Sequence, residues 1–219
     1  MKGKLIVIDG PDSVGKSTQT ALLARRLRKL GFKVLVTDFP RYGHPSAWLV
    51  EQYLKGKFGS AKKVGPFVPA IFFAVDRYAA AEEMRQALKQ GKILISNRYV
   101  TASMAHQGLQ FPSKSKRQEF YKWVQELEYK TFGLPKPDFH LFLHMPYKVS
   151  LSLMDARKGK KKDINEKNLN HLKKAEQTYL EIAHKFKYKV VRSVVNNKLQ
   201  KPAEINERIW QILKSKLKA

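Results

Sequence analysis

The feature that most constrains the fold is a regular alternation between short apolar runs and longer segments whose apolar residues recur at helical spacing. The apolar runs are mostly continuous, as in Leu5-Ile6-Val7-Ile8. Continuous runs are typical of strands buried on both faces, and their alternation with helices is typical of a parallel sheet. We therefore predict a three-layer α/β fold, a five-stranded parallel sheet with helices on both faces. The strands are expected at residues 4–9, 33–38, 92–96, 139–143 and 189–195.

The helices are expected between these strands, where apolar residues recur every three or four positions. They are predicted at residues 17–30, 47–54, 68–89, 100–107, 114–131, 147–157, 169–186 and 203–218, and residues 55–66 are predicted to form a loop. No internal repeat or linker divides the chain, so residues 1–219 are expected to form a single domain. Ligands of such sheets bind beyond the carboxyl ends of the strands. Chemistry is therefore expected in the loops after Asp9, Asp38 and Ser96.

Composition excludes several classes of site. The chain has no cysteine, which excludes a disulfide framework, a thiolate zinc site, an iron–sulfur cluster and a cysteine nucleophile. The apolar runs fall far short of the roughly 18 residues that a membrane-spanning helix needs. The N-terminus also lacks the residue order of a secretory signal. A cytoplasmic protein without a membrane partner is expected.

The net charge is +25, from 43 Lys+Arg and 18 Asp+Glu. Such a charge favours partners that carry phosphate, but it does not identify a reaction. The basic residues are densest at residues 157–174. This stretch is either a nucleic-acid patch or a solvated helix face, and because it has no interleaved aromatic residues, nucleic acid is the less favoured partner.

A phosphate-binding loop follows the first predicted strand. Its sequence, Gly10-Pro11-Asp12-Ser13-Val14-Gly15-Lys16-Ser17, matches G-x-x-x-x-G-K-[ST] and lies between a predicted strand and a predicted helix. The glycines let backbone N–H groups turn toward phosphate, and the helix N-terminus adds its dipole. Lys16 is expected to reach the terminal phosphates, and Ser17 to offer its hydroxyl to Mg²⁺. With Thr18, this loop predicts an ATP site.

The class of phosphate-binding protein is narrowed by what surrounds this loop. A GTPase would need N-K-x-D, but the nearest candidate, Asn197-Lys198-Leu199-Gln200, lacks the carboxylate. A nucleic-acid-stimulated ATPase would normally end a strand in Asp or Asp-Glu, whereas the third strand is followed by Asn97-Arg98. A kinase acting on a small anionic acceptor needs arginines to hold that acceptor in line. Three candidates are available: Arg41, Arg77 and Arg98.

Five motifs in order resemble those of the thymidylate kinases over almost the full length of the chain. They are the phosphate loop with its acidic Asp12, Phe39-Pro40-Arg41-Tyr42-Gly43, Phe73-Ala74-Val75-Asp76-Arg77, Asn97-Arg98-Tyr99 with Ser103 and Gln107, and Thr178-Tyr179-Leu180-Glu181-Ile182-Ala183. The resemblance implies a P-loop NTPase fold, ATP and dTMP as substrates, dTDP as product, Mg²⁺, and a homodimer packed through the helix around residues 68–87. Another nucleoside monophosphate kinase or a deoxynucleoside kinase stays open, as does, less favoured, a nucleic-acid-stimulated ATPase.

The resemblance also assigns roles to residues. Phe73 would stack on the thymine ring and Arg77 would donate to its O4. Arg98 and Arg41 would hold the 5′-phosphate, and Asp12 would accept from the 3′-hydroxyl or organise solvent at the metal. The remaining acceptor contacts would come from Phe39, Pro40, Ser103, His106 and Gln107.

Two of the departures from the family pattern concern the metal and the catalytic cation. Asn97 stands where the family usually has Asp, and a neutral amide supplies no charge to hydrated Mg²⁺. Asp9 is the candidate that would supply this charge instead, so the expected metal residues are Ser17 and Asp9. Ser13 stands where one branch has a catalytic arginine, so the missing cation is expected from a short basic lid at residues 157–168. Arg157 is the favoured cation, assisted by one of Lys160, Lys161 and Lys162. The expected catalytic set is thus Lys16, Arg98, Asp12 and Arg157.

Overall fold

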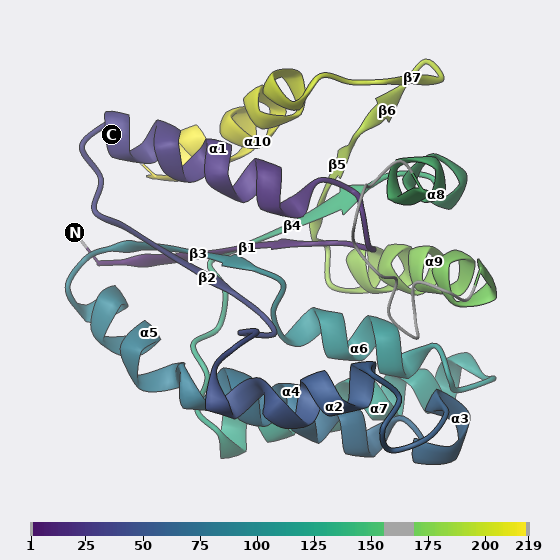
Figure 1. Cartoon of the computed structure of the whole chain (residues 1–219). Coiled ribbons are helices and arrows are strands. Elements are labelled where there is room, and N and C mark those ends of the chain that lie inside the picture. The colour runs from purple at the N-terminus through teal and green to yellow at the C-terminus, as the bar shows by residue number, and fades with distance from the viewer. Residues whose placement is uncertain (1, 156–168, 218–219) are drawn as a thin grey trace.

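The computed structural model describes residues 2–155 and 169–217, which form three layers (Figure 1). The central layer is a five-stranded sheet in the order β2-β3-β1-β4-β5, and every neighbouring pair is parallel. Its strands are β1 (Lys4–Asp9), β2 (Val34–Asp38), β3 (Ile93–Asn97), β4 (Phe139–His144) and β5 (Lys189–Arg192). The predicted α/β class and five-stranded parallel sheet are confirmed.

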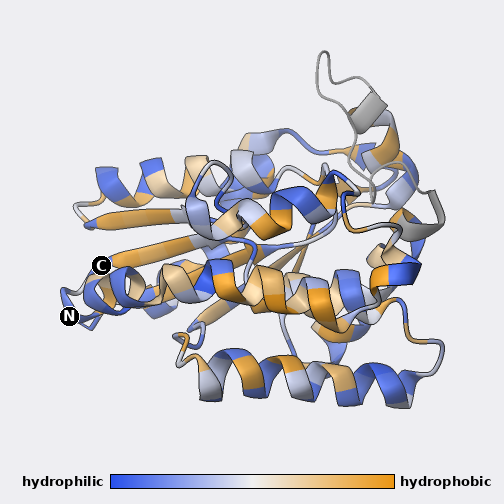
Figure 2. Ribbon diagram, turned by 60° about the horizontal axis from the view of Figure 1, so that its bottom comes forward, coloured by the Kyte–Doolittle hydropathy of each residue, from blue (hydrophilic) through white to orange (hydrophobic). Residues whose placement is uncertain are grey.

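Each central strand contributes to two cores because successive side chains point to opposite faces of a sheet. Leu5 and Val7 of β1 belong to the core on one face, whereas Ile6 and Ile8 belong to the core on the other. All four are fully buried. Figure 2 shows the strands mostly in hydrophobic colours and the helices with polar and apolar residues interspersed. The continuous apolar runs are therefore explained by burial on both faces.

Helices cover both faces of the sheet (Figure 1). One face carries α1 (Lys16–Lys29) and α10 (Pro202–Leu217), which pack against each other. The other carries α4 (Phe67–Ala79), α5 (Ala81–Lys89), α6 (Val100–Gly108), α7 (Lys114–Gln125) and α9 (Leu169–Lys185). The 3₁₀ turn η1 (Pro45–Ala47) and α2 (Trp48–Leu54) pack on α4, and α8 (Tyr147–Asp155) lies beside α9. No helix among the described residues is long and apolar enough to cross a membrane.

Two expected helical segments are interrupted. The single helix expected at residues 68–89 is divided into α4 and α5 at Ala80, whose N–H donates to the carbonyl of Arg77, three residues back. This bond spans three residues instead of the four of an α-helix, so it tightens the last turn of α4 and changes the direction of the chain. The helix expected at residues 114–131 becomes a π-helical segment, η2, at Glu126–Thr131. That segment contributes Glu128, which is important for the site.

Two other predictions were wrong in detail. The loop expected at residues 55–66 contains a short helix, α3 (Ala61–Val64), because the Ser60 side chain accepts from the N–H of Lys63 and caps it. The strand expected at residues 189–195 ends at Arg192. Beyond it lies a small hairpin of β6 (Val194–Val195) and β7 (Lys198–Leu199). Its two turn residues, Asn196 and Asn197, have φ of 48° and 57°, values that asparagine tolerates better than most residues.

Candidate active site

The phosphate loop joins β1 to α1 and requires glycine at both ends. Gly10 has φ of 147°, and a Cβ there would lie 2.5 Å from the carbonyl oxygen of Leu143. Gly15, just before α1, has φ of 90°. Ser13 also has a positive φ, 63°, which is uncommon for a residue with a side chain. The sequence pattern therefore reflects backbone conformations that only a few residue types tolerate.

Lys16 begins α1 with its side chain folded back over this loop. Its Nζ donates to the carbonyl oxygen of Pro11 at 2.6 Å. Burial, and then the positive charge of Arg98, lower the pKa of Lys16 to about 7, although the nearby carboxylates of Asp12, Asp9 and Asp38 oppose that shift. A phosphate group beside this lysine would raise its pKa again, because a nearby negative charge favours the protonated form.

Arg98 lies at the end of β3, between the phosphate loop and α6. Its backbone is left-handed, with φ of 64°, a strained conformation for arginine. Its guanidinium forms an ion pair with Asp12 and donates to the carbonyl of Gly10 at 3.3 Å. It also lies 3.2 Å from Nε2 of His106. Burial opposes the charge of Arg98, but the carboxylates of Asp12 and Asp9 raise its pKa, so Arg98 is a permanent cation at this position.

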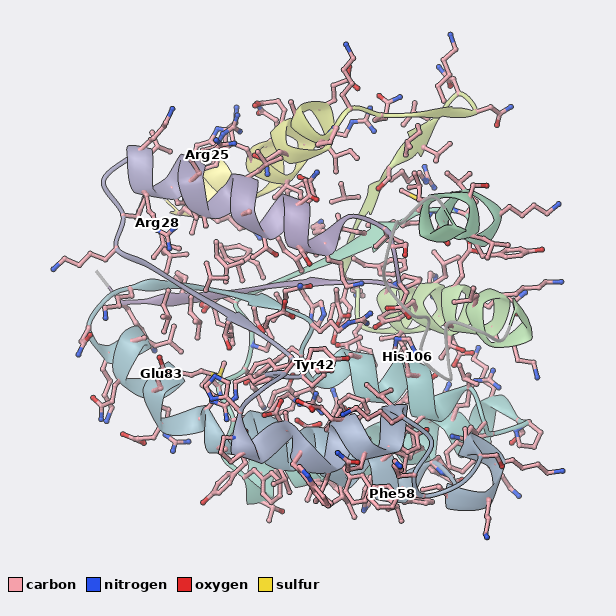
Figure 3. All side chains as sticks on the ribbon, viewed as in Figure 1. Arg25, Arg28, Tyr42, Phe58, Glu83 and His106 are labelled. Atoms are coloured by element: carbon pink, nitrogen blue, oxygen red, sulfur yellow. The ribbon has the colours of Figure 1, made fainter. Side chains whose placement is uncertain are left out.

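A cavity opens next to Arg98 and contains most of the predicted acceptor residues. Its lining residues are Asp12, Pro40, Tyr42, Leu54, Phe73, Arg98, Ala102, Ser103, His106 and Gln107. Figure 3 shows Tyr42 and His106 in the middle of the molecule, between the sheet and α4. Gln107 is buried, and its Oε1 has no hydrogen-bond partner among the described residues. The sequence did not single out Leu54 or Ala102, since apolar residues at a pocket wall give no signal that distinguishes them from core.

Phe39 and Arg41, two further predicted acceptor residues, do not line this cavity. Phe39 is buried and packs against Tyr99, with the ring centroids 6.1 Å apart. Arg41 is held by Asp76 of α4, which accepts from its backbone N–H at 2.8 Å and from Nε at 3.3 Å. Ser46 joins them by accepting from Nη2 of Arg41 at 2.7 Å and donating to Asp76 at 2.6 Å. Asp76, a residue the sequence did not assign a role, fixes the position of Arg41.

Arg77 is also held by a carboxylate. Its Nε and Nη2 donate to the two carboxylate oxygens of Glu128 at 2.5 and 2.7 Å, and Nη2 donates to Oγ of Ser103 at 2.6 Å. Arg77 and Glu128 are both buried. The direct contact to thymine stays a prediction, because in this structure Arg77 reaches the cavity through Ser103. Glu128 lies 51 positions away in the π-helical segment, and no sequence motif pointed to it.

Asp9, the predicted metal residue, is fully buried and contacts groups of the protein. One carboxylate oxygen accepts from the Tyr179 hydroxyl at 2.8 Å and from the N–H of Gly10 at 2.9 Å. The other lies 3.8 Å from Nε2 of His140. Burial favours the neutral acid, but His140, Arg98 and the Gly10 N–H together lower the pKa of Asp9. These partners indicate a structural role for Asp9, and its role at the metal stays a prediction. Tyr179, the donor to Asp9, belongs to the fifth motif.

The side chain that contacts Ser17 is Asn97. Its Nδ2 donates to Oγ of Ser17 at 3.1 Å and to Oδ2 of Asp38 at 2.9 Å. Oδ1 of Asn97 is buried and has no partner among the described residues. Within the same residues, no group of three or more His, Cys, Asp or Glu side chains is placed to hold a metal. The Ser17 hydroxyl, Oδ1 of Asn97 and the Asp38 carboxylate nevertheless fit Mg²⁺. This ion is usually held by few protein ligands, by water and by substrate phosphates.

The predicted lid cation cannot be placed. Arg157, Lys160, Lys161 and Lys162, together with the whole expected lid at residues 157–168, lie outside the described residues.

The site combines a loop that has a phosphate-binding sequence with a second, aromatic-walled cavity, and Arg98 contacts both. On a parallel sheet, this arrangement defines a P-loop kinase that acts on nucleotides. A family model described as thymidylate kinase matches residues 8–205. The chain belongs to the thymidylate kinase family.

Comparison with individual proteins agrees with this membership. The chain is 29% identical to a probable thymidylate kinase of Pyrococcus abyssi, over 99% of this chain and 98% of that protein. It is 30% identical to the thymidylate kinase of Limosilactobacillus fermentum, over 93% and 92% of the two chains. The solved structure of the thymidylate kinase from Candida albicans has the same fold, with a TM-score of 0.74 at 23% identity, over 98% of this chain and 92% of that one.

Proposed function

We propose that this protein transfers the γ-phosphate of ATP to dTMP, giving ADP and dTDP. The observation that carries the proposal is the position of Arg98, which donates to the phosphate loop at Gly10 and lines the adjacent cavity with Phe73. One cation at this boundary serves both the donor and the acceptor phosphates. The family membership and the names of the relatives support dTMP as the acceptor.

Transfer requires positioning and neutralisation of charge more than proton transfer. A phosphate oxygen of dTMP attacks the γ-phosphorus while the bond from that phosphorus to the β,γ-bridging oxygen breaks, and the electron pair leaves with ADP. The acceptor phosphate is already ionised at neutral pH, so no general base is needed. Lys16 binds the terminal phosphates of ATP, and Arg98 with Arg41 holds the acceptor phosphate. Mg²⁺, bound beside Ser17, would neutralise charge on the β- and γ-phosphates.

The cavity next to Arg98 offers complementary contacts to thymidine. Phe73 provides an aromatic face for the base, and the unpaired Oε1 of Gln107 is an acceptor for a ring N–H. Ser103, held by Arg77, and His106 complete the polar edge. Asp12, which forms an ion pair with Arg98, would accept from the 3′-hydroxyl.

The proposal also includes the lid cation and the place of action in the cell. Arg157 would close on the transferring phosphoryl group as the lid cation that Ser13 does not supply. The cytoplasm, which supplies both nucleotides, would be the place of action.

The activity is tested by measuring ADP release from ATP and Mg²⁺ with dTMP, dUMP, UMP, CMP, AMP and GMP in parallel, and with single-stranded DNA in place of an acceptor. Turnover with dTMP well above the others is expected. If every monophosphate failed while ATP still bound, the acceptor assignment would be wrong. Stimulation by DNA would instead identify a nucleic-acid-dependent ATPase that uses the basic surface.

A homodimer packed through α4 is the second part of the proposal. Val68, Ile71, Val75 and Tyr78 recur at helical spacing, and each is between 37% and 53% exposed. A stripe of this kind marks a protein interface more often than a surface exposed to solvent. Light scattering should give twice the chain mass for the wild type and a monomer for Ile71→Glu. Leu199→Glu, at an exposed residue of the β6–β7 hairpin, is the matched control and should stay dimeric.

A further inference from the structure

The carboxyl ends of β2 and β3 bring Asp38 and Asn97 side by side. The two residues are direct partners in the register of the parallel pair. The backbone continues the pairing, since the N–H of Phe39 donates to the carbonyl of Asn97 at 3.0 Å. Both side chains therefore leave the sheet at the edge where the phosphate loop begins α1.

The amide of Asn97 joins Asp38 to the phosphate loop. Nδ2 donates at 2.9 Å to Oδ2 of Asp38 and at 3.1 Å to Oγ of Ser17. A carboxylate only accepts, so the amide nitrogen must face Asp38. This leaves Oδ1, buried and without a partner among the described residues, as a free acceptor next to Ser17. A buried, unpaired acceptor costs free energy unless a donor fills it.

The other two carboxylates near the loop differ from Asp38 in pairing or in burial. Asp12 forms an ion pair with Arg98. Asp9 is fully buried: one oxygen accepts from Tyr179, and the other, 3.8 Å from Nε2 of His140, has no hydrogen-bond partner among the described residues. Asp38 is exposed, and within residues 2–155 and 169–217 it forms no ion pair; its side-chain partner is the neutral amide of Asn97. Lys16 and Arg98 act on Asp38 through their charge, but the group that contacts its carboxylate and links it to Ser17 is a neutral amide.

We infer that Asp38 supplies the negative charge for the divalent cation that accompanies ATP. Asp38 also orients the Asn97 amide, so that Oδ1 of Asn97 accepts from the water molecules around that cation. The carboxylate that a strand-end Asp at position 97 would have provided lies instead on the neighbouring strand. Asn97 retains the hydrogen-bonding part of the function and Asp38 the charge. Asp38 is a positioning residue, since it acts through Asn97 and water.

This inference rests on the proposed binding of ATP with a divalent cation. It is tested with Mn²⁺, whose free form is counted by electron paramagnetic resonance, in the presence of a non-hydrolysable ATP analogue and without an acceptor. For Asp38→Asn, the dissociation constant for Mn²⁺ should rise about 10-fold, as expected when an outer ligand partner is lost. The analogue alone, measured in EDTA, should bind both proteins about equally.

Two further variants make the result specific to this position. Asp38→Asn combined with Asn97→Asp returns the charge to β3, and should restore Mn²⁺ affinity to within about threefold of the wild type. Asp138→Asn changes the net charge equally at an exposed ion pair with Lys4 at the opposite end of the sheet, and should leave Mn²⁺ affinity unchanged.

The outcomes separate the two hypotheses. If the wild type fails to bind the analogue in EDTA, the proposed ATP site is wrong. If the analogue binds but Asp38→Asn has wild-type affinity for Mn²⁺, or the double variant is no better than Asp38→Asn, then the role of Asp38 is wrong. Circular dichroism melts confirm that each variant is folded.

Discussion

The two walls of the site are built in different ways. The phosphate wall comes from nine consecutive residues, Asp9 to Ser17, whose conformation is set by glycines and by the start of α1. The acceptor wall is assembled from residues between positions 12 and 107, carried on the phosphate loop, α2, α4 and α6 and on the segments between them. A wall of the first kind is encoded locally, whereas one of the second kind depends on how distant elements pack.

In the acceptor wall, ion pairs between distant elements fix the positions of the arginines. Asp76 on α4 holds Arg41 in the loop after β2, and Glu128 in the π-helical segment holds Arg77 on α4. Each pair fixes an arginine that a motif requires but that the motif cannot position. The comparison predicts that changes in these carboxylates affect the acceptor and leave the binding of ATP intact.

The largest effect is expected when the Arg77–Glu128 pair is broken. Glu128→Gln removes the carboxylate charge and leaves Arg77 as a buried, uncompensated cation, which typically costs about 3–5 kcal/mol. Urea unfolding should therefore show a loss of this size in the free energy of unfolding. A loss below about 1 kcal/mol would mean that water or another group satisfies Arg77.

The matched control is Glu126→Gln, two residues earlier in the same segment. The side chain of Glu126 is 44% exposed, and among the described residues its ion pair is with Lys130, four residues on, at 3.4 Å. Such pairs contribute about 0.3–0.5 kcal/mol. If both variants lost the same stability, the π-helical segment and not the buried pair would be responsible.

The next largest effect is expected at the boundary between the walls. Arg98→Ala should lower kcat/KM for dTMP by at least about 100-fold, because a charge-assisted phosphate contact in a closed site is lost. Steady-state kinetics with saturating ATP measure this ratio. Arg85→Ala, at a surface arginine of α5 that pairs with Glu82, should behave as the wild type. A near-normal ratio for Arg98→Ala would refute the acceptor site.

The difference between the walls also explains what the sequence could predict. The strands, the phosphate loop and the order of helices follow from periodicity and glycine placement within short windows. Most cavity residues, among them Phe73 and Gln107, could be named from motifs because each motif lies on one element. Their partners could not be named, because Glu128 contacts Arg77 only after α4 and the π-helical segment have packed.

The inferred role of Asp38 is the part of the site that the sequence predicts least. Asp9 is the residue that the sequence favours because it precedes the phosphate loop, but its neighbours Tyr179 and His140 come from α9 and β4, far along the chain. Asp38 ends a strand that carries no phosphate motif. Only the register of β2 against β3 places it beside Asn97.

A smaller effect is expected for the second ion pair of the acceptor wall. Asp76→Asn weakens the hydrogen bonds that hold Arg41, so KM for dTMP should rise about 10-fold while KM for ATP stays within twofold. Initial rates with each substrate varied in turn separate the two constants. Glu82→Gln, at an exposed glutamate of α5 that pairs with Arg85, is the control. An equal rise in both KM values would show that the two walls are not independent.

The smallest effect is expected in the phosphate wall itself, where burial lowers the pKa of Lys16 to about 7. At pH 8 a group with this pKa is about nine-tenths neutral, whereas bound phosphates return it to the charged form. Binding of ATP in EDTA should thus take up nearly one proton at pH 8, and its Kd should rise about fivefold from pH 7 to pH 8. Calorimetry in buffers of different ionisation enthalpy counts that proton. Lys16→Arg stays charged throughout, so the uptake and the pH dependence should both disappear; if they persist, another group takes up the proton.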